Sequence, residues 1–237
     1  MKKYFILIVI CVITFRIDAQ NLSFFSNLGS NLDDRATNIS VGPNGNVYIL
    51  GQSDDTLFVP NSSGNVAAIA PISHKNYFLA CINSSGQYLW TKMFGFGTVE
   101  NSFARFAVNP NGDIAFLICA DDFIKIGADS IPSFGKCLNV LCKLDGSGNL
   151  LTHQSVFNII STGVVEGIKI DNNSNIYISG NYRNSLELLT NGTLDSVVYP
   201  LGHSKNAFFI KYNNALNRLY TKQIGSLIYG EGVTLAR

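Results

Sequence analysis

The chain has 237 residues, of which 14% are charged and 46% are hydrophobic, and its 17 Lys and Arg nearly balance its 16 Asp and Glu. Such a composition, rich in Gly, Asn, Ser and β-branched residues, is typical of an all-β protein. No block of like charges is present that could hold a polyelectrolyte, so nucleic acid is not expected as a partner.

Residues 1–19 have the pattern of a secretory signal peptide. Lys2 and Lys3 precede the apolar segment 4–15, and a short polar exit ends at Ala19. An uncleaved membrane anchor is the alternative, but about 12 apolar residues fall short of the roughly 20 that cross a bilayer. We therefore expect an exported mature chain of residues 20–237, with no membrane span after signal cleavage.

The mature chain contains two patterns that recur about every 65 residues. In the first, an apolar segment enters an Asn/Gly-rich turn and leaves it as a second apolar segment. Its copies are 39–51, 106–117 and 168–180. The second pattern is a similar hairpin, and its copies begin at 77, 139 and 207. Turns of about four residues join antiparallel strands, so each repeat is predicted to hold four of them.

A four-stranded antiparallel sheet repeated at this length is typical of a β-propeller blade. Segments 47–50 and 208–210 are apolar throughout, so each sheet needs a neighbour on both faces, and radial stacking supplies it. The sequence thus predicts an all-β fold with almost no helix. Its predicted blades are 36–95, 103–157 and 165–225.

The two ends of the mature chain match parts of a blade. Residues 23–29 are similar to the fourth strand of the first repeat, 89–95, and residues 231–235 are similar to 166–170. We therefore expect partial strands at 22–29 and 231–237. Three blades are fewer than the about four of the smallest closed propellers, so an incomplete propeller is expected.

The repeats resemble a known family, the bacterial β-propeller repeats called SBBP repeats, which occur in secreted proteins of Bacteroidetes-like bacteria. The resemblance rests on 44–51, 173–180 and 143–151 and extends over nearly all of the mature chain. It implies architecture and export, with no reaction attached. Two residues depart from the pattern: Ile118 replaces a strand Gly, and Leu216 replaces a turn Gly. Both are expected to weaken single blades without changing the fold.

Four cysteines remain after signal cleavage: Cys81, Cys119, Cys137 and Cys142. An oxidising compartment permits disulfides between them without requiring any. Because most of these residues lie within apolar runs, buried thiols are the favoured prediction.

No metal or cofactor site is predicted. His74, His153 and His203 lack companion ligands at zinc spacing. Asp171, Asn173 and Asn175 alternate as in a calcium loop, but Ile176 and Tyr182 stand where that loop needs Gly and Glu. A plain turn is therefore expected at 171–175.

No catalytic residue is predicted, because no nucleophile elbow or triad is present. The recurring aromatic residues are interpreted as packing between blades rather than as a carbohydrate platform. They are Tyr48, Trp90, Phe94, Tyr177 and Tyr220.

The favoured hypothesis is a non-enzymatic binding or spacer module at the cell surface or outside the cell. Its partners would be an unknown protein or glycan, or further blades of a longer protein. The alternative is a propeller-fold enzyme of the lyase or glycosidase type, whose active site missing blades would complete. Segments 39–41, 106–108 and 168–170, which would line the central channel, carry one charge among nine residues, which favours the first hypothesis.

Ligand contacts are expected from three long connections, 52–75, 119–136 and 181–205. They should gather with 96–103 and 157–164 around one end of the channel. The alternative is that these connections merely add hairpins that cover apolar surface.

Overall fold

The computed structural model describes residues 27–60, 66–73, 75–96, 103–120, 122–126, 128–132, 137–160, 163–201, 205–225 and 234–235. The predicted signal peptide lies outside these residues. Within them the chain is all-β, with antiparallel sheets and one short 3-10 turn, η1 (Pro43–Gly45). The described residues include no helix with the length and apolar character needed to cross a bilayer.

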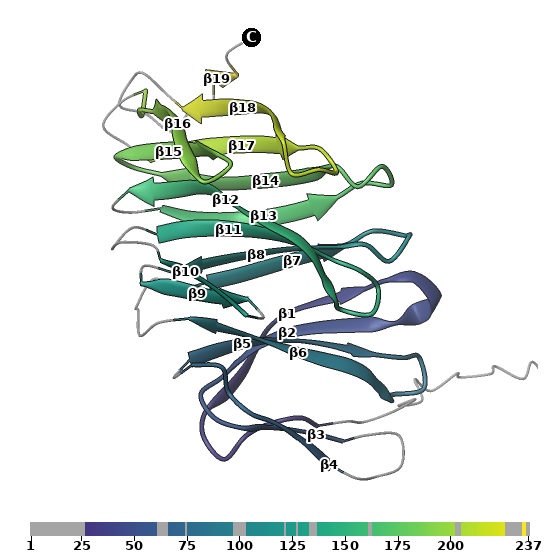
Figure 1. The fold of residues 1–237 in the computed structure, drawn as a ribbon. Coiled ribbons are helices and arrows are strands. Elements are labelled where there is room, and N and C mark those ends of the chain that lie inside the picture. The colour runs from purple at the N-terminus through teal and green to yellow at the C-terminus, as the bar shows by residue number, and fades with distance from the viewer. Residues whose placement is uncertain are drawn as a thin grey trace, which may run out of the picture.

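Each repeat forms four antiparallel strands, which confirms the predicted strand order. The first sheet contains β1 (Asp34–Val41), β2 (Val47–Ser53), β5 (Lys75–Ile82) and β6 (Tyr88–Phe96). The second contains β7 (Phe103–Val108), β8 (Ile114–Ala120), β11 (Cys137–Leu144) and β12 (Leu150–Ile160). The third contains β13 (Gly163–Ile170), β14 (Ile176–Tyr182), β17 (Asn206–Tyr212) and β18 (Arg218–Gly225). Figure 1 shows the three sheets stacked in chain order.

The three long connections form hairpins, as in the alternative interpretation. These are β3 (Leu57–Pro60) with β4 (Val66–Ile69), β9 (Phe123–Ile126) with β10 (Asp129–Pro132), and β15 (Ser185–Thr190) with β16 (Thr193–Val198). Strand β9 pairs with β6, and β15 pairs with β12. The hairpins of the second and third repeats therefore extend the last strand of the preceding sheet, so the first two sheets have six strands instead of the predicted four. The hairpin β3–β4 forms a separate two-stranded sheet.

The hairpin of the first repeat makes the same kind of contact near the N-terminus. Gly29 N donates to Phe58 O at 3.3 Å, and Phe58 N donates to Gly29 O at 2.7 Å. The equivalent contact in the next repeat joins Gly95 to Lys125. Of the partial strand expected at 22–29, only 27–29 are described. Of the one expected at 231–237, β19 (Thr234–Leu235) is described, and it pairs with the end of β18.

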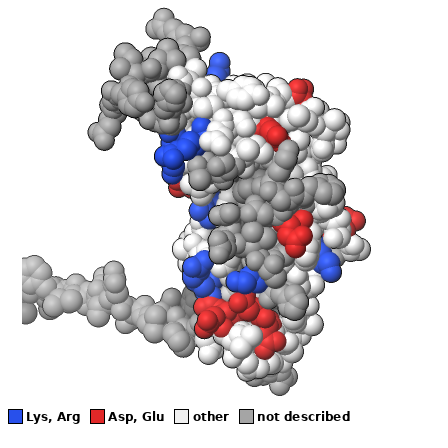
Figure 2. All heavy atoms as spheres, turned by 90° about the vertical axis from the view of Figure 1, so that its left-hand side faces the viewer, with Lys and Arg blue, Asp and Glu red and all other residues white. Residues whose placement is uncertain are grey.

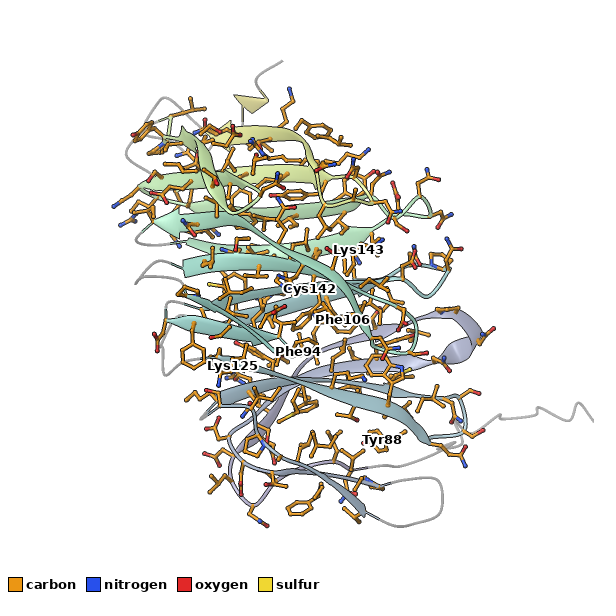
Figure 3. All side chains as sticks on the ribbon, in the orientation of Figure 1. Tyr88, Phe94, Phe106, Lys125, Cys142 and Lys143 are labelled. Carbon is orange, nitrogen blue, oxygen red and sulfur yellow. The ribbon has the colours of Figure 1, made fainter. Side chains whose placement is uncertain are left out.

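Apolar side chains fill the layers between sheets. The layer between the first and second sheets includes Tyr48, Leu50, Phe94, Phe106, Phe116 and Cys142. Phe94, Phe106 and Cys142 are labelled in Figure 3. The layer between the second and third sheets includes Leu117, Leu141, Ile168, Ile178 and Phe208. Tyr48, Trp90 and Phe94 thus pack between sheets, as predicted.

The remaining face of the first sheet is covered in part by its own hairpin. Phe78, Ala80 and Met93 from this face are buried together with Leu57 and Val59 of β3. Among the described residues no sheet precedes the first repeat, and the hairpin covers part of this face instead.

Five of the turns share one hydrogen-bond pattern. Their first residue is Asn or Asp, and one side-chain oxygen accepts the N–H groups of the residues two and four positions later. The first residues are Asn83, Asn109, Asp145, Asp171 and Asn213. The fourth residue of each turn has a positive φ, which favours Gly. The sequence 171–175 is therefore a plain turn, as predicted.

The cysteine prediction is confirmed at two positions and wrong at one. Cys81 and Cys142 are free, buried thiols, and burial raises the pKa of each. Cys119 is disulfide-bonded. An apolar sequence context shows that a cysteine is buried, but it does not show whether a second sulfur lies within bonding distance.

The departure at Ile118 is accommodated by two local changes. Gly51 and Gly180 lie opposite Phe78 and Phe208 on the neighbouring strands, whereas Ile118 lies opposite the smaller Val140. On the other side, Gly51 pairs with Ala36 of β1 and Gly180 pairs with Val165 of β13, and a β-bulge follows each of these two partners. Strand β7 has a regular register where it pairs with Ile118. The second sheet thus replaces Gly, Phe and a bulge by Ile, Val and a regular strand.

Candidate functional site at the inner strands

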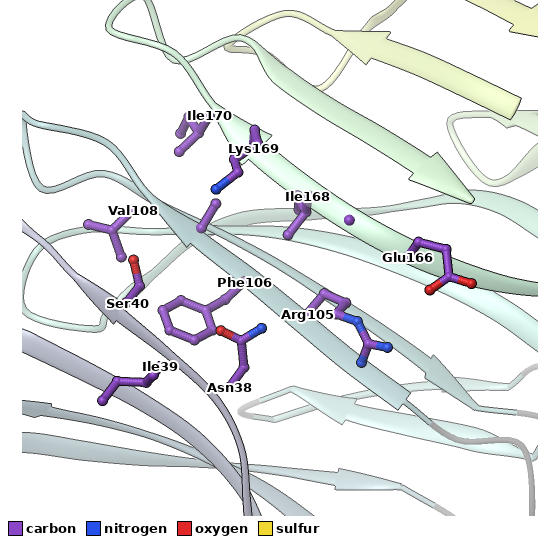
Figure 4. A pocket seen from close by; sticks show the side chains of 12 residues that line it. Asn38, Ile39, Ser40, Arg105, Phe106, Val108, Glu166, Ile168, Lys169 and Ile170 are labelled. Carbon is purple, nitrogen blue, oxygen red and sulfur yellow. The ribbon is translucent and has the colours of Figure 1, made fainter.

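The first strands of the three sheets, β1, β7 and β13, lie next to one another along one edge of the stack. These three are called the inner strands, and their edge the inner edge. Strand β7 contacts both β1 and β13. A cleft of about 250 Å³ opens along them, as shown in Figure 4. It is lined by Asn38, Ile39, Ser40, Arg105, Phe106, Ala107, Val108, Glu166, Gly167, Ile168, Lys169 and Ile170. This volume is small for a ligand pocket, and it suits a single sugar unit or a side-chain-sized group.

Three charged side chains line the cleft. In Figure 4, Arg105 and Glu166 lie toward one end of the cleft and Lys169 lies away from them, with Ile168 between. Among the described residues, no ion pair joins these three side chains to one another. With two cationic groups and one carboxylate, the cleft can receive an acidic group and also accept a hydrogen bond.

Local contacts position two of these groups. One nitrogen of the Arg105 guanidinium donates to Ala104 O at 2.9 Å, and the group lies 5.6 Å from the centroid of the Phe103 ring. Glu166 is the extra residue of the β13 bulge, and its Oε1 accepts a hydrogen bond from Asn181 Nδ2 at 3.1 Å. A bulge changes the direction of the side chain it carries, and bulges are frequent beside functional sites.

The sequence interpretation found the cleft's apolar lining but missed most of its charge. Residues 106–108 and 168–170 line the cleft as predicted, and so do Ile39 and Ser40. Arg105 and Glu166 lie one and two residues before the segments that were considered, and the bulge at Glu166 has no clear sequence signal. The surface along these three strands is thus more charged than one charge in nine residues suggested.

Residues of the first long connection line two other clefts. One is formed by Asp33, Asp34, Arg35, Gln52, Asp54 and Lys75, and the other by Asp54, Pro71, Ile72, Ser73 and Lys125. Figure 2 shows blue and red side chains close together on the left-hand side of Figure 1, without a large area of one charge.

Much of 96–103 and part of 157–164 lie outside the described residues, so their predicted place around the channel is not described.

The candidate metal ligands of the sequence do not come together. His153 Nε2 lies 2.9 Å from Asp129 Oδ2 on β10, and neither has a further ligand group. His74 and His203 lie outside the described residues. In the part of the chain that the structure describes, no group of three or more His, Cys, Asp or Glu could hold a metal ion.

Comparison with known proteins adds little to this geometry. No protein-family model matches the chain, and no curated protein matches it. A solved structure of virginiamycin B lyase from Staphylococcus aureus is similar at 11% identity, over 83% of this chain and 89% of that chain. Its TM-score is 0.21, so this likeness carries no argument about fold or function.

Proposed function

We propose that the three sheets are blades of a β-propeller of the SBBP-repeat type, and that this chain by itself forms an incomplete propeller. The support is the repeated strand order together with the packing of the first strands at one inner edge. In a propeller the first strand of every blade lines the central channel, so the cleft along β1, β7 and β13 would be part of that channel.

We propose further that the protein is exported and acts as a non-enzymatic binding module or scaffold, with its ligand in the inner-strand cleft. The single observation that carries this proposal is a cleft lined by one strand from each of three sheets, with Arg105, Glu166 and Lys169 on an apolar wall. The expected ligand is a carboxylate-bearing group of a glycan or of a protein. Export rests on the signal-peptide pattern of residues 1–19.

Binding of residues 20–237 to an array of uronic-acid glycans, neutral glycans and acidic peptides tests this proposal. We expect retention of acidic ligands, lost in Arg105→Ala and Lys169→Ala but kept in Lys125→Ala, since Lys125 lies outside the cleft. Equal retention by the variants and the parent chain would overturn the assignment of the cleft. Failure of the parent chain to bind any acidic ligand would overturn the binding function.

A propeller-fold enzyme is the second candidate, because charged groups from two sheets meet at the channel side. The lining of the cleft includes one carboxylate, Glu166. A glycosidase of the usual kind needs two carboxylates, so further blades would have to supply the second. Turnover of a uronic-acid polymer by the chain together with the blades that complete the site, lost in Glu166→Gln, would favour this candidate over the first.

A further inference from the structure

The outer face of the third sheet, opposite to the one packed on the second sheet, is partly open. It carries Tyr177, Phe209, Lys211, Tyr220 and Lys222, which alternate along their strands with side chains directed at the second sheet. Tyr177 is only partly buried, whereas Tyr48, its equivalent in the first sheet, is 1% exposed. Tyr220 on the same face is 40% exposed. The rings of Tyr177 and Phe209 are 6.0 Å apart, and those of Phe209 and Tyr220 are 6.1 Å apart.

Three side chains on this face occupy positions whose equivalents in the first and second sheets donate hydrogen bonds to the next sheet in the stack. Trp90 Nε1 donates to Gly146 O of the second sheet at 2.9 Å, and Lys92 Nζ donates to Asn149 Oδ1 at 3.5 Å. Lys143 Nζ donates to Asn214 Oδ1 of the third sheet. Counted from the turns, the equivalents of Trp90, Lys92 and Lys143 in the third sheet are Tyr220, Lys222 and Lys211. The outer face thus repeats the donors of the two interfaces already formed.

The other end of the stack carries the matching half of such an interface. Ile39 and Val41 of β1 are 67% and 68% exposed. Their equivalents in the third sheet, Ile168 and Ile170, are buried against the second sheet. The turn at 83–87 presents exposed Ser84 and Gln87.

Ser84 is equivalent to both Gly146 and Asn214, and Gln87 is equivalent to Asn149. The acceptors used in the existing interfaces therefore have counterparts on the first sheet. Ser84 offers its carbonyl and hydroxyl oxygens, and Gln87 offers its amide oxygen.

We propose that a second copy of this chain docks head to tail, with its first sheet on the outer face of the third sheet. The proposal rests on the proposed function in one respect, namely that the sheets stack as blades. Lys211 would donate to the Ser84 hydroxyl, Tyr220 to the Ser84 carbonyl, and Lys222 to Gln87 Oε1 of the other copy. Two outer faces would not pair with each other, because each carries Lys211 and Lys222, and like charges repel.

Docking requires an exchange of strand contacts. Phe58 is bridged to Gly29 in the structure, while Gly225 is paired with Thr234. In the docked state Gly225 would pair with Phe58 of the other copy, as Gly95 pairs with Lys125 within the chain. Each interface thus gives up two strand contacts, Gly29 with Phe58 and Gly225 with Thr234, and forms one new strand contact. The burial of Ile39 and Val41 and the three side-chain hydrogen bonds are the gains that offset this loss.

A head-to-tail contact forms a closed ring or an open filament, depending on the rotation it imposes. Two copies of three blades give about six blades, which lies within the range of closed propellers. We therefore expect the association to end at two copies.

Sedimentation velocity of residues 20–237 over a concentration series tests the proposal. We expect a dimer for the parent chain and a monomer for two double variants, Lys211→Glu with Lys222→Glu and Ile39→Glu with Val41→Glu. The control is Leu151→Glu on β12, where the side chain is 56% exposed, and it should remain dimeric. Far-UV circular dichroism would show that every variant is folded.

Mixing the two double variants is the decisive step. Each mixed pair keeps one intact interface, so dimers should reappear with a larger Kd than that of the parent chain. A monomeric parent chain, a species larger than a dimer, or folded variants that stay monomeric when mixed would each overturn the proposal. The masses of Arg105→Ala and Lys169→Ala should match the parent, so failure of the cleft assignment is distinguishable from failure of this one.

Discussion

Gly51 lies directly opposite Phe78 on the neighbouring strand, and a Cβ atom placed on Gly51 would lie 2.2 Å from the ring. The carbonyl oxygen of Arg35 would be 2.8 Å away. The ring and the bulged strand β1 therefore occupy the space that any side chain at this position would need. The second sheet, with Ile118 opposite Val140, shows the other combination of sizes.

This relationship predicts coupling between positions 51 and 78. Gly51→Ala should lower the free energy of unfolding by about 1–3 kcal/mol, because overpacking displaces the Phe78 ring. In a Phe78→Val background the same change should cost at least about 1 kcal/mol less. Denaturant unfolding of the four proteins in this double-mutant cycle measures the coupling, and strictly additive effects would contradict the explanation.

Ser174 and Asp113 connect the turns of the third and second sheets. The Ser174 hydroxyl donates to Asp113 Oδ2 at 2.5 Å, and Ser174 has a φ of 58°. Ser174→Ala should destabilise the chain by about 1.5–3 kcal/mol, since it removes a hydrogen bond to a charged group. Ser174→Gly should cost about 1 kcal/mol less than Ser174→Ala, because Gly accepts the left-handed backbone without strain. Thermal unfolding of the two variants tests the order, and a more stable Ala variant would be inconsistent with it.

Leu216 combines a strained backbone with a buried side chain. Its φ is 62°, and the side chain is 1% exposed within the layer between the second and third sheets. Leu216→Ala should cost about 2–5 kcal/mol, because burial is lost and the strain remains. Leu216→Gly should be no worse than Leu216→Ala, the reverse of the order expected within a regular strand. Urea unfolding gives both values, and a Gly variant clearly weaker than the Ala variant would contradict this account.

Asp171 should make the stability of the chain sensitive to acid. Hydrogen bonds from Asn175, together with those from Tyr177 and Asn173, lower the pKa of Asp171 to about 2. A folded-state pKa below the unfolded value means that the carboxylate's contribution is present above the unfolded pKa and is lost as the pH falls through the folded one. Between about pH 4 and pH 2, stability should fall less steeply in Asp171→Asn than in the parent chain. Unfolding measured across this window tests the claim, and parallel curves would refute it.

Much of the fold could be predicted because turn chemistry is local. Asn109, Asp145 and Asp171 at the first position of a turn, with a left-handed residue three positions later, define where strands begin and end. The hairpin pairings between sheets could not be predicted in this way. A strand such as β9, with four residues, has no local signal that selects β6 as its partner rather than a strand of its own sheet.

The effect of Ile118 and Leu216 on their sheets depends on neighbours for a similar reason. Each departs from a family pattern at one position, yet its consequence depends on a neighbour. Val140 leaves room for Ile118, and the layer beneath Leu216 buries its side chain. Neither neighbour is adjacent in the sequence, so the compensation becomes visible only when the strands are paired.

The pairing of β9 with β6 and of β15 with β12 also has a consequence for the growing chain on the ribosome. The last strand of one repeat has an uncovered edge until the following repeat has been synthesised as far as its hairpin. An uncovered strand edge is a site for pairing with other chains. A pause in translation when residue 96 or residue 160 has just emerged from the ribosome would therefore prolong the interval in which nascent chains aggregate. A pause after residue 132 or residue 198 has emerged would come when that edge can already be closed.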